Sequence, residues 1–284
     1  MPEKNYLVLM SDFLDELLVV LVIYKMKIAE SAAYHSLTQA LMTIGSSTSL
    51  FVYDNSPYIQ RPPNDSVWSI QYVHDASNPG VSKAYNEGFG FAKERNKKWL
   101  LLLDQDTTFP SHSVEEYFKA ASSHPIVVPI LKDRFGTVSP LRFYFGGGQR
   151  VKRSEGNAVM NLNDFLFHNS GLLVATETFE RAGGYDEDLK LDFSDFAFVH
   201  RLRMHNKEFA LANFYCSHGL ATSEVKTRDE RLTRFESYVS AGKYFKKTYA
   251  HSDQFLLTRF FLRGVKLCLQ YRTHKFMLAI FRHT

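Results

Sequence analysis

The stretch that most constrains the fold of this chain is residues 99–110, WLLLLDQDTTFP. Its four consecutive leucines predict a β-strand that is buried on both faces, as strands of parallel sheets are. The strand ends at Asp104 and Asp106, whose side chains point to the same side in extended chain, roughly 6–7 Å apart. Ligands of open α/β sheets bind at this strand edge. Two carboxylates there can hold a divalent cation that in turn holds phosphate, although a polar strand end followed by a turn is the plainer alternative.

Patterns typical of strands and helices alternate on both sides of this stretch. Strands are predicted at residues 17–24, 49–53, 68–74, 100–103, 126–131, 172–175 and 209–216, and helices at about 25–42, 82–95, 111–122, 176–182, 194–204 and from 227 onward. This alternation predicts an α/β fold with a mostly parallel central sheet and helices on both of its faces. Residues 1–16 give no clear pattern, and the three glycines at 146–148 indicate a flexible or tightly turned segment.

The size and composition are those of a globular protein. A chain of 284 residues, 45% of them hydrophobic, can form one large domain with an appended segment. No run of 18 apolar residues occurs, so we expect no transmembrane helix, and the first residues lack a signal-peptide pattern. The two cysteines, Cys216 and Cys268, fit no metal-binding spacing and are expected to be reduced thiols of a cytoplasmic protein.

The charge is distributed unevenly. Residues 226–284 contain 13 Lys/Arg and 4 Asp/Glu, a net charge of +9, so the remainder carries −5 of the total of +4. Within residues 255–282, apolar side chains follow helical spacing beside basic ones: Phe260, Phe261, Val265 and Leu269 beside Arg259, Arg263, Lys266 and Arg272. Such a helix can lie on an anionic membrane surface, or it can pack on its own domain with its basic side in solvent. Nucleic-acid binding is not expected, because no reading motif accompanies the charge.

Several short motifs follow one another in order along the chain. They are residues 52–56 (VYDNS), 78–80 (NPG), 84–88 (AYNEG), 103–107 (LDQDT), 183–187 (GGYDE), 192–203 (DFSDFAFVHRLR) and His218. In this order the sequence resembles the family 2 glycosyltransferases of the GT-A fold, most closely their rhamnosyltransferase-like branch, in which Asp-Gln-Asp often replaces the commoner acidic triplet. The resemblance covers about residues 17–220. It implies a GT-A domain over residues 1–222 and a basic helical extension over residues 223–284.

The resemblance implies a binding site for the nucleotide of a sugar donor. Tyr24 falls where the family lines the base, Asp54 where it contacts the base or ribose, and Asp104 near the ribose. Lys83 and Asn86 fall where the start of a helix approaches the nucleotide, and helix N-termini favour phosphate in any case. For Tyr24, an aromatic side chain at the strand boundary without a binding role remains an alternative. For Lys83 and Asn86 the alternative is a solvated helix face.

The resemblance also implies a divalent metal ion, Mn²⁺ or Mg²⁺. Asp106 matches the leading ligand, Asp104 is a secondary candidate, and His218 matches the late histidine that completes metal coordination in many relatives. These residue types agree with the expectation, because imidazole suits Mn²⁺ and carboxylates suit Mg²⁺ or Mn²⁺. A purely structural role for His218 is the alternative.

Asp195 matches the catalytic base of the family. An inverting sugar transfer needs a carboxylate that accepts the proton of the attacking hydroxyl, while a cation neutralises the leaving diphosphate. Asp192 is the reserve candidate, and Arg201 matches a following arginine of the family. The alternative for Asp195 is an acid that the helix dipole favours in a first turn. At Ala197 the sequence departs from many relatives, which have glutamate there.

Residues 169–171, Asn169, Ser170 and Gly171, fall where the family shapes the pocket for the donor sugar and the acceptor, with a tight turn as an equal alternative. We therefore expect an inverting, metal-dependent transferase that uses a dTDP- or UDP-linked sugar. The Asp-Gln-Asp variant indicates a dTDP-linked deoxysugar such as rhamnose as the donor, while UDP-hexoses remain open. The acceptor would be a saccharide or lipid-linked saccharide of a bacterial surface polysaccharide such as O-antigen or capsule. The enzyme would work in the cytoplasm or at the inner face of the plasma membrane.

Two other classes fit some of the same residues. In a haloacid-dehalogenase-type phosphatase, Asp104 would be the nucleophile and Asp106 the acid/base, but that motif belongs on a first strand, and here other strands precede it. A non-catalytic protein that binds nucleotide sugars would keep the fold without the transfer. A dinucleotide-binding oxidoreductase is disfavoured, because no Gly-x-Gly-x-x-Gly follows the first strand.

Overall fold

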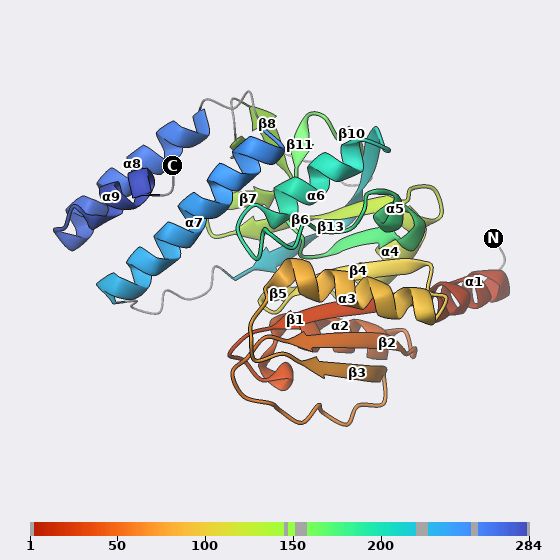
Figure 1. The fold of residues 1–284 in the computed structure, drawn as a ribbon. Helices are drawn as coiled ribbons and strands as arrows, with labels where there is room; N and C mark the ends of the chain where they lie inside the picture. Colours follow the sequence, from red (N-terminus) through yellow and green to blue (C-terminus); the bar gives the residue numbers. More distant parts are fainter. Residues whose placement is uncertain (1–2, 145–146, 151–157, 220–226, 251–254, 283–284) are drawn as a thin grey trace.

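A large mixed sheet forms the centre of the molecule (Figure 1). The computed structural model describes residues 3–144, 147–150, 158–219, 227–250 and 255–282. In the first half of the sheet, four strands are parallel to their neighbours in the order β4-β1-β2-β3. Their bounds are β1 Leu17–Ile23, β2 Thr48–Asp54, β3 Trp68–His74 and β4 Trp99–Asp104. Their carboxyl ends therefore meet at one edge.

The second half of the sheet continues from β4 in the order β12-β6-β13-β10. The strand β12 is antiparallel to both of its neighbours, whereas β6 and β13 are parallel to each other. The short strands β5 and β7 pair with β13 and β6, and β8, β9 and β11 form a separate small sheet. The bounds are β5 Thr107–Thr108, β6 Ile126–Asp133, β7 Gly136–Ser139, β8 Leu141–Tyr144, β9 Gly147–Arg150, β10 Val159–Asn161, β11 Phe165–Leu166, β12 Leu172–Ala175 and β13 Glu208–His218.

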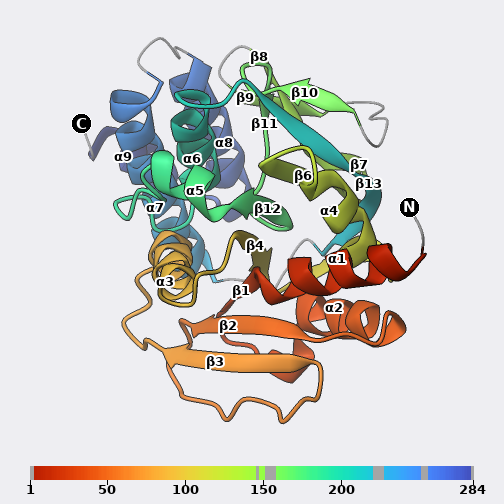
Figure 2. The same cartoon turned by 90° about the vertical axis from the view of Figure 1, so that its right-hand side faces the viewer.

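Helices cover both faces of the sheet (Figures 1 and 2). Helices α1 (Glu3–Asp15), α2 (Ala32–Thr43) and α4 (Ser113–Ala121) pack on one face, and α3 (Val81–Glu94), α5 (Thr176–Arg181) and α6 (Ser194–Arg203) pack on the other. A short 3₁₀ helix, η1 (Ile28–Glu30), precedes α2. The leucine run of β4 contributes to both cores, with Leu101 and Leu103 on the first face and Leu100 and Leu102 on the second. All four are at most 2% exposed, as the apolar run predicts.

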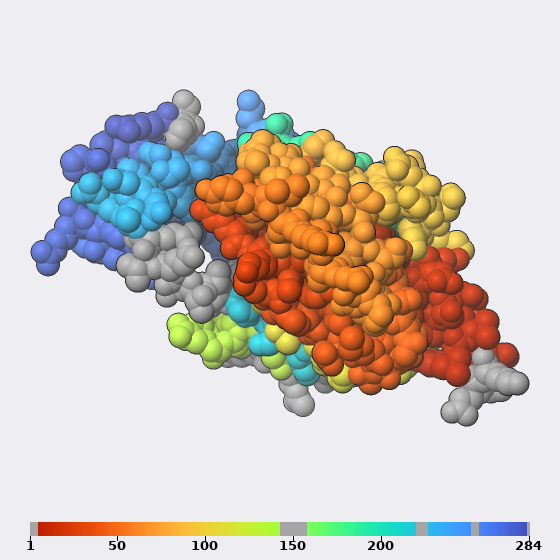
Figure 3. Space-filling model, turned by 90° about the horizontal axis from the view of Figure 1, so that it is seen from below, coloured from red at the N-terminus to blue at the C-terminus, as the bar shows by residue number. Residues whose placement is uncertain are grey.

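The C-terminal helices pack on the rest of the molecule through a third core. Helices α7 (Arg228–Thr248), α8 (Phe255–Tyr271) and α9 (Lys275–Arg282) bury Phe235, Phe260 and Phe276 against Phe193 and Ala197 at the start of α6. Burying one such phenylalanine contributes roughly 1.5–3 kcal/mol. Seen from below, these blue helices form the end of the molecule that lies opposite α1 (Figure 3).

The predicted α/β fold is confirmed, and most predicted elements lie within two residues of the observed ones. The short strands β5, β7, β8, β10 and β11 were not predicted, and three further details differ. Residues 3–15 form α1, where no element was predicted, and Gly147 begins β9 rather than a turn; Gly146 lies outside the described residues. The C-terminal apolar stripe divides between two faces, because Phe260 is fully buried whereas Phe261 is 49% exposed. No helix in the described part of the chain has the length and hydrophobicity to span a membrane.

Candidate active site

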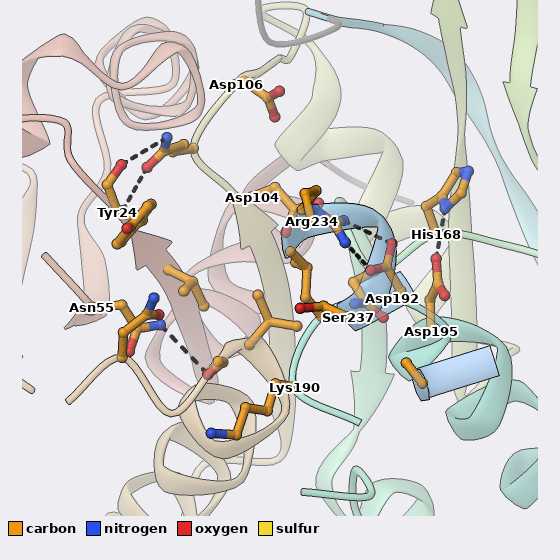
Figure 4. A pocket seen from close by; sticks show the side chains of 18 of the residues that line it. Tyr24, Asn55, Asp104, Asp106, His168, Lys190, Asp192, Asp195, Arg234 and Ser237 are labelled. Atoms are coloured by element: carbon orange, nitrogen blue, oxygen red, sulfur yellow. Dashed lines mark hydrogen bonds and ion pairs between the residues drawn. The ribbon is translucent and has the colours of Figure 1, made fainter. Parts of the chain in front are cut away.

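A cavity of about 990 Å³ opens at the edge where the parallel strands end (Figure 4). Tyr24 follows β1, Asn55 follows β2 and Asp104 ends β4, so the sheet topology brings these three residues to one place. The start of α3 adds Gly80, and the start of α6 adds Asp195. Predicted residues that line the cavity are Tyr24, Asp104, Asp106, Asn169, Asp192, Asp195 and His218.

The acidic pair after β4 lies in a partly buried, negatively charged environment. The hydroxyl of Tyr85 donates a hydrogen bond of 2.9 Å to Asp104 Oδ1. Burial, together with the negative charge of Asp106, raises the pKa of Asp104, and burial raises the pKa of Asp106. A bound divalent cation would favour the ionised form of both carboxylates and so oppose these shifts.

His218 reaches the acidic pair from the last position of β13. Its partner in the antiparallel pairing with β5 is Thr107, and its Nδ1 lies 2.8 Å from Thr107 Oγ1 and 3.7 Å from Asp106 Oδ1. The hydrogen bond to Thr107 orients the ring, as outer partners of metal-binding histidines do. The carboxylates and the imidazole fit Mn²⁺ in donor type. Within the described residues, however, no three His, Cys, Asp or Glu side chains are already grouped as a metal cage.

Ser170 supports the acidic pair through hydrogen bonds, and Gly171 follows it in a closely packed backbone position. Ser170 is 1% exposed; its Oγ accepts the backbone N–H of Asp104 at 3.1 Å and donates to Thr107 Oγ1 at 2.8 Å. Gly171 has a φ of +81°, and a Cβ there would lie 2.5 Å from Pro129 Cγ. Neither residue lines the cavity, whereas Asn169 beside them does and accepts a hydrogen bond of 2.7 Å from the hydroxyl of Tyr185.

Asp195 lies in the first turn of α6 and is paired with a histidine. His168 Nδ1 is 2.7 Å from Asp195 Oδ2, and the backbone N–H of Phe196 donates to Oδ1 at 2.8 Å (Figure 4). Although burial acts in the opposite direction, the hydrogen bond and the charge of Asp195 raise the pKa of His168. His168 directly precedes the predicted residues 169–171, but nothing in the sequence indicates its contact with residue 195.

Asp192, the reserve candidate for the base, is held in an ion pair. Both of its carboxylate oxygens accept hydrogen bonds from the guanidinium of Arg234 on α7, one of them at 2.8 Å. The hydrogen bond to Asp192 raises the pKa of Arg234. Asp192 therefore lines the cavity as part of an ion pair with Arg234 whose charges cancel. The partner of Asp195 is instead a histidine, His168, which can gain or lose a proton near neutral pH.

Helix α7 forms one wall of the cavity and supports the turn before Asp195. Phe193, which precedes α6, has a φ of +65°, an uncommon conformation for a bulky residue. Its ring stacks on Tyr238 and Phe245 of α7, with both centroid distances 5.3 Å. The sequence predicts this helix as part of a separate extension and gives no indication of its cavity residues, which are Arg234, Ser237, Ser240, Ala241 and Tyr244. Hydroxyl-bearing residues on a helix carry no sequence signal for such a role.

The departure at residue 197 has a packing explanation. Ala197 is fully buried in the core that α6 shares with α7, α8 and α9. A glutamate at this position would place a charge among apolar side chains, which costs several kcal/mol unless the charge is paired. A small apolar side chain at residue 197 therefore allows the C-terminal helices to pack on α6.

Two predicted donor-binding residues point away from the cavity. Asp54 is fully buried and accepts hydrogen bonds from Gln60 at 2.7 Å and Tyr72 at 2.8 Å. Burial acts to raise its pKa, but hydrogen bonds from Ser56, Gln60 and Tyr72 lower it below the usual value. Its neighbour Asn55 lines the cavity instead; Asn55 is 3% exposed, and its Oδ1 has no hydrogen-bond partner among the described residues. Lys83 also lies outside the cavity and pairs with Glu87 at 2.8 Å.

Asn86 and Arg201 both hold the turn between α5 and α6 and do not line the cavity. The side chain of Asn86 accepts the backbone N–H of Tyr185 at 2.8 Å and donates to its carbonyl at 3.0 Å. Arg201 donates to the carbonyls of Gly183 and Gly184 at 3.1 and 3.0 Å. The structure thus places these two residues behind the site, where they fix the loop that leads to Asp192.

Comparison with known proteins identifies the family. Residues 35–180, just over half of the chain, match the model of glycosyl transferase family 2. The chain therefore belongs to glycosyl transferase family 2. No curated protein matches the sequence.

Solved structures share the architecture. The crystal structure of GalNAc-T7 with UDP, GalNAc and Mn²⁺ superposes with a TM-score of 0.54 at 12% identity, over 82% of this chain and 48% of that one. This chain thus spans about half the length of GalNAc-T7. TarS 1–349 of S. aureus, in complex with UDP-GlcNAc, gives 0.48 at 14% identity over 85% of this chain and 70% of that one. At such identities the likeness to GalNAc-T7 concerns the fold, which is that of a GT-A glycosyltransferase.

Proposed function

We propose that this protein is an inverting glycosyltransferase that moves a sugar from a nucleoside diphosphate donor to a hydroxyl group of an acceptor. Its membership of glycosyl transferase family 2 supports sugar transfer. The observation that carries the proposal is that one cavity contains both the acidic pair after β4 and the histidine-paired Asp195. The first can hold a leaving diphosphate through a cation, and the second can accept a proton.

The nucleotide end of the donor would lie against Tyr24 and Asn55. The buried Oδ1 of Asn55, without a partner in the described residues, is suited to accept a hydrogen bond from a base or a ribose hydroxyl. Asp54 would act indirectly, because its hydrogen bond from the backbone N–H of Ser56, 2.9 Å long, fixes the turn that presents Asn55. Lys83 and Asn86 do not line the cavity, so they too would act on the nucleotide-binding part of the site only indirectly.

The diphosphate would lie near Asp104, Asp106 and His218. Asp106 and His218 would hold a divalent cation, with Asp104 as a further ligand or a contact to the ribose. When bound, such a cation supplies positive charge that stabilises the leaving nucleoside diphosphate. Ser170 and Thr107 keep the backbone of Asp104 and the ring of His218 in place through their hydrogen bonds.

Asp195 would be the general base. As the acceptor oxygen bonds to the anomeric carbon, the bond from that carbon to the diphosphate oxygen breaks, and the hydroxyl proton passes to the Asp195 carboxylate. His168 keeps this carboxylate in one orientation through its 2.7 Å hydrogen bond. Attack from the face opposite the leaving group inverts the anomeric configuration.

The acceptor would enter beside α7, and for that reason we propose that the catalytic unit extends beyond residue 222. Ser237 and Ser240 present hydroxyls to the cavity, and the Asp192–Arg234 pair offers both donors and acceptors. These groups suit a saccharide or a lipid-linked saccharide. Asn169 would shape the sugar pocket, Gly171 would fix the backbone next to it, and Arg201 would hold its loop. A deoxysugar donor such as rhamnose, and a role in bacterial surface polysaccharide, remain parts of the proposal that rest on the sequence motifs.

The proposal is tested by comparing Asp195→Asn with Asp192→Asn, which make the same chemical change three residues apart. The donor is first chosen from a thermal-shift panel of nucleoside diphosphate sugars with and without Mn²⁺, because a bound ligand raises the melting temperature. Asp195→Asn should keep donor binding and lower the rate of diphosphate release at least about a hundredfold. Asp192→Asn should have a smaller effect. The reverse order would make Asp192 the base, and unchanged rates in both variants would refute a carboxylate base here.

A further inference from the structure

The C-terminal helices carry a second apolar surface that faces away from the molecule. One side of α8 is buried: Phe260 is 0% exposed and packs in the core shared with α7. On its other side, Leu257, Phe261, Leu262 and Leu269 are 44%, 49%, 63% and 77% exposed. In Figure 1, α8 and α9 lie at the outer end of the molecule, with α7 between them and the sheet.

Helical geometry gathers these exposed residues on one face. At about 100° per residue, Leu257, Phe261, Leu269 and Leu262 fall within a sector of about 140°. This outer face of α8, defined by these four residues, is separate from the buried face that contains Phe260. An apolar sector of this width on a helix is typical of a face that is buried against something else.

The charge of these helices is of one sign. Residues 255–282 contain six Lys/Arg and no Asp/Glu. Arg259 and Lys266 lie next to the apolar sector on the circumference of α8. All six basic residues are exposed: Arg259, Arg263, Lys266, Arg272, Lys275 and Arg282. A partner for this surface must therefore offer negative charge together with an apolar phase.

We propose that the outer face of α8 lies on an anionic phospholipid membrane. Its leucines and phenylalanine would enter the boundary between headgroups and acyl chains, while the basic residues contact lipid phosphates. A second copy of this chain is disfavoured as the occupant, because pairing this face with itself would bring the bordering Arg259 and Lys266 close to their copies, in a segment that contains no acidic residue. Membrane binding of this kind does not depend on the sugar-transfer reaction.

Helix α7 lies between this surface and the active site and contacts both regions. One face of α7 lines the cavity with Ser237 and Tyr244, and other residues of the same helix, such as Phe235, pack in the core with α8 and α9. Two layers of helix, α7 and α8, each about 10 Å thick, would therefore separate the cavity from the bilayer. A lipid-linked acceptor could then reach Asp195 while the enzyme stays bound; this step alone rests on the proposed function.

Co-sedimentation of the full chain with vesicles tests the membrane proposal. The probes are vesicles of phosphatidylglycerol with phosphatidylcholine, and vesicles of phosphatidylcholine alone, both without nucleotide. Binding should need the anionic lipid. Leu262→Gln with Leu269→Gln should lower the partition coefficient at least about tenfold. Arg259→Gln with Lys266→Gln should lower it at least about tenfold in 0.1 M salt, with the difference largely lost in 1 M salt.

The matched control is Leu7→Gln on α1, which removes a leucine that is 64% exposed at the opposite end of the molecule. It should leave vesicle binding unchanged. All these side chains are exposed, so melting temperatures should stay within about 2 °C of the wild type.

Equal binding by all variants, or binding without preference for anionic lipid, would overturn the proposal. So would a dimer in light scattering that Leu262→Gln with Leu269→Gln dissociates, because that result would make this face an interface between copies. Loss of activity by Asp195→Asn with normal vesicle binding would leave this inference intact.

Discussion

Replacing His168 with glutamine removes the side chain that orients Asp195. The contact is 2.7 Å long, and the side chains of His168 and Asp195 are 33% and 16% exposed. Hydrogen bonds to charged groups contribute about 1.5–3 kcal/mol, and solvent screening at this exposure reduces the value to about 1 kcal/mol. Since 1.36 kcal/mol corresponds to a tenfold change in rate, we expect kcat to fall about 5- to 10-fold. The fall for Asp195→Asn should be at least about a hundredfold.

The same contact predicts a pH dependence of stability. Asp195 raises the pKa of His168 in the folded state, while an unfolded chain has a histidine pKa of about 6.5. The contribution to stability is therefore fully present below about pH 6.5 and is lost as the pH rises through the raised pKa. The melting temperature of His168→Gln should be about 2–4 °C below wild type near pH 6, and the gap should shrink toward pH 9.

Two assays measure these effects, the rate of nucleoside diphosphate release and thermal melting over this pH range. His205→Gln is the control, because His205 is exposed and does not line the cavity. It should change neither quantity. An unchanged kcat in His168→Gln, or a melting difference that is constant with pH, would refute the assigned role of His168.

Further predictions concern the rest of the site. Asp106→Asn should abolish the rise in melting temperature that Mn²⁺ causes in the wild type, measured by thermal shift; a normal rise would contradict its role as a ligand. Arg234→Met should lower the free energy of unfolding by about 1 kcal/mol, because Asp192 loses its partner and the pair is partly exposed. Gly171→Ala should cost about 2–4 kcal/mol in urea denaturation, because of its φ of +81° and the close Pro129; a cost under about 0.5 kcal/mol would contradict the geometry.

The central fold follows from local sequence patterns. The β3 strand lies at Trp68–His74, as the alternation predicts, and the leucine run of β4 is buried on both faces because both core layers need apolar side chains there. Helix α1 was not predicted, because the exposed apolar residues Leu7 and Val8 obscure the helical spacing of its buried apolar residues.

The contacts within the site depend on tertiary structure and could not be predicted in the same way. The partner of Asp195 is 27 residues away, and that of Asp192 is 42 residues away on a helix whose sequence indicates only part of a basic helical segment. Asp54 turns inward because Tyr72 and Gln60, from a neighbouring strand and a loop, satisfy its carboxylate. The motif therefore led to the correct strand end at the cavity, but the residue that lines the cavity there is Asn55 and not Asp54.

The central claim is that the acidic pair after β4 seats the donor diphosphate through a cation, with Asp195 in the same cavity to accept a proton. Anomalous diffraction from a crystal with Mn²⁺ and a nucleoside diphosphate measures this directly. The account predicts a manganese peak within about 2.5 Å of an Asp106 oxygen and of a His218 nitrogen, with phosphate oxygens on the same ion. A manganese peak elsewhere, or a diphosphate outside this cavity, would contradict it.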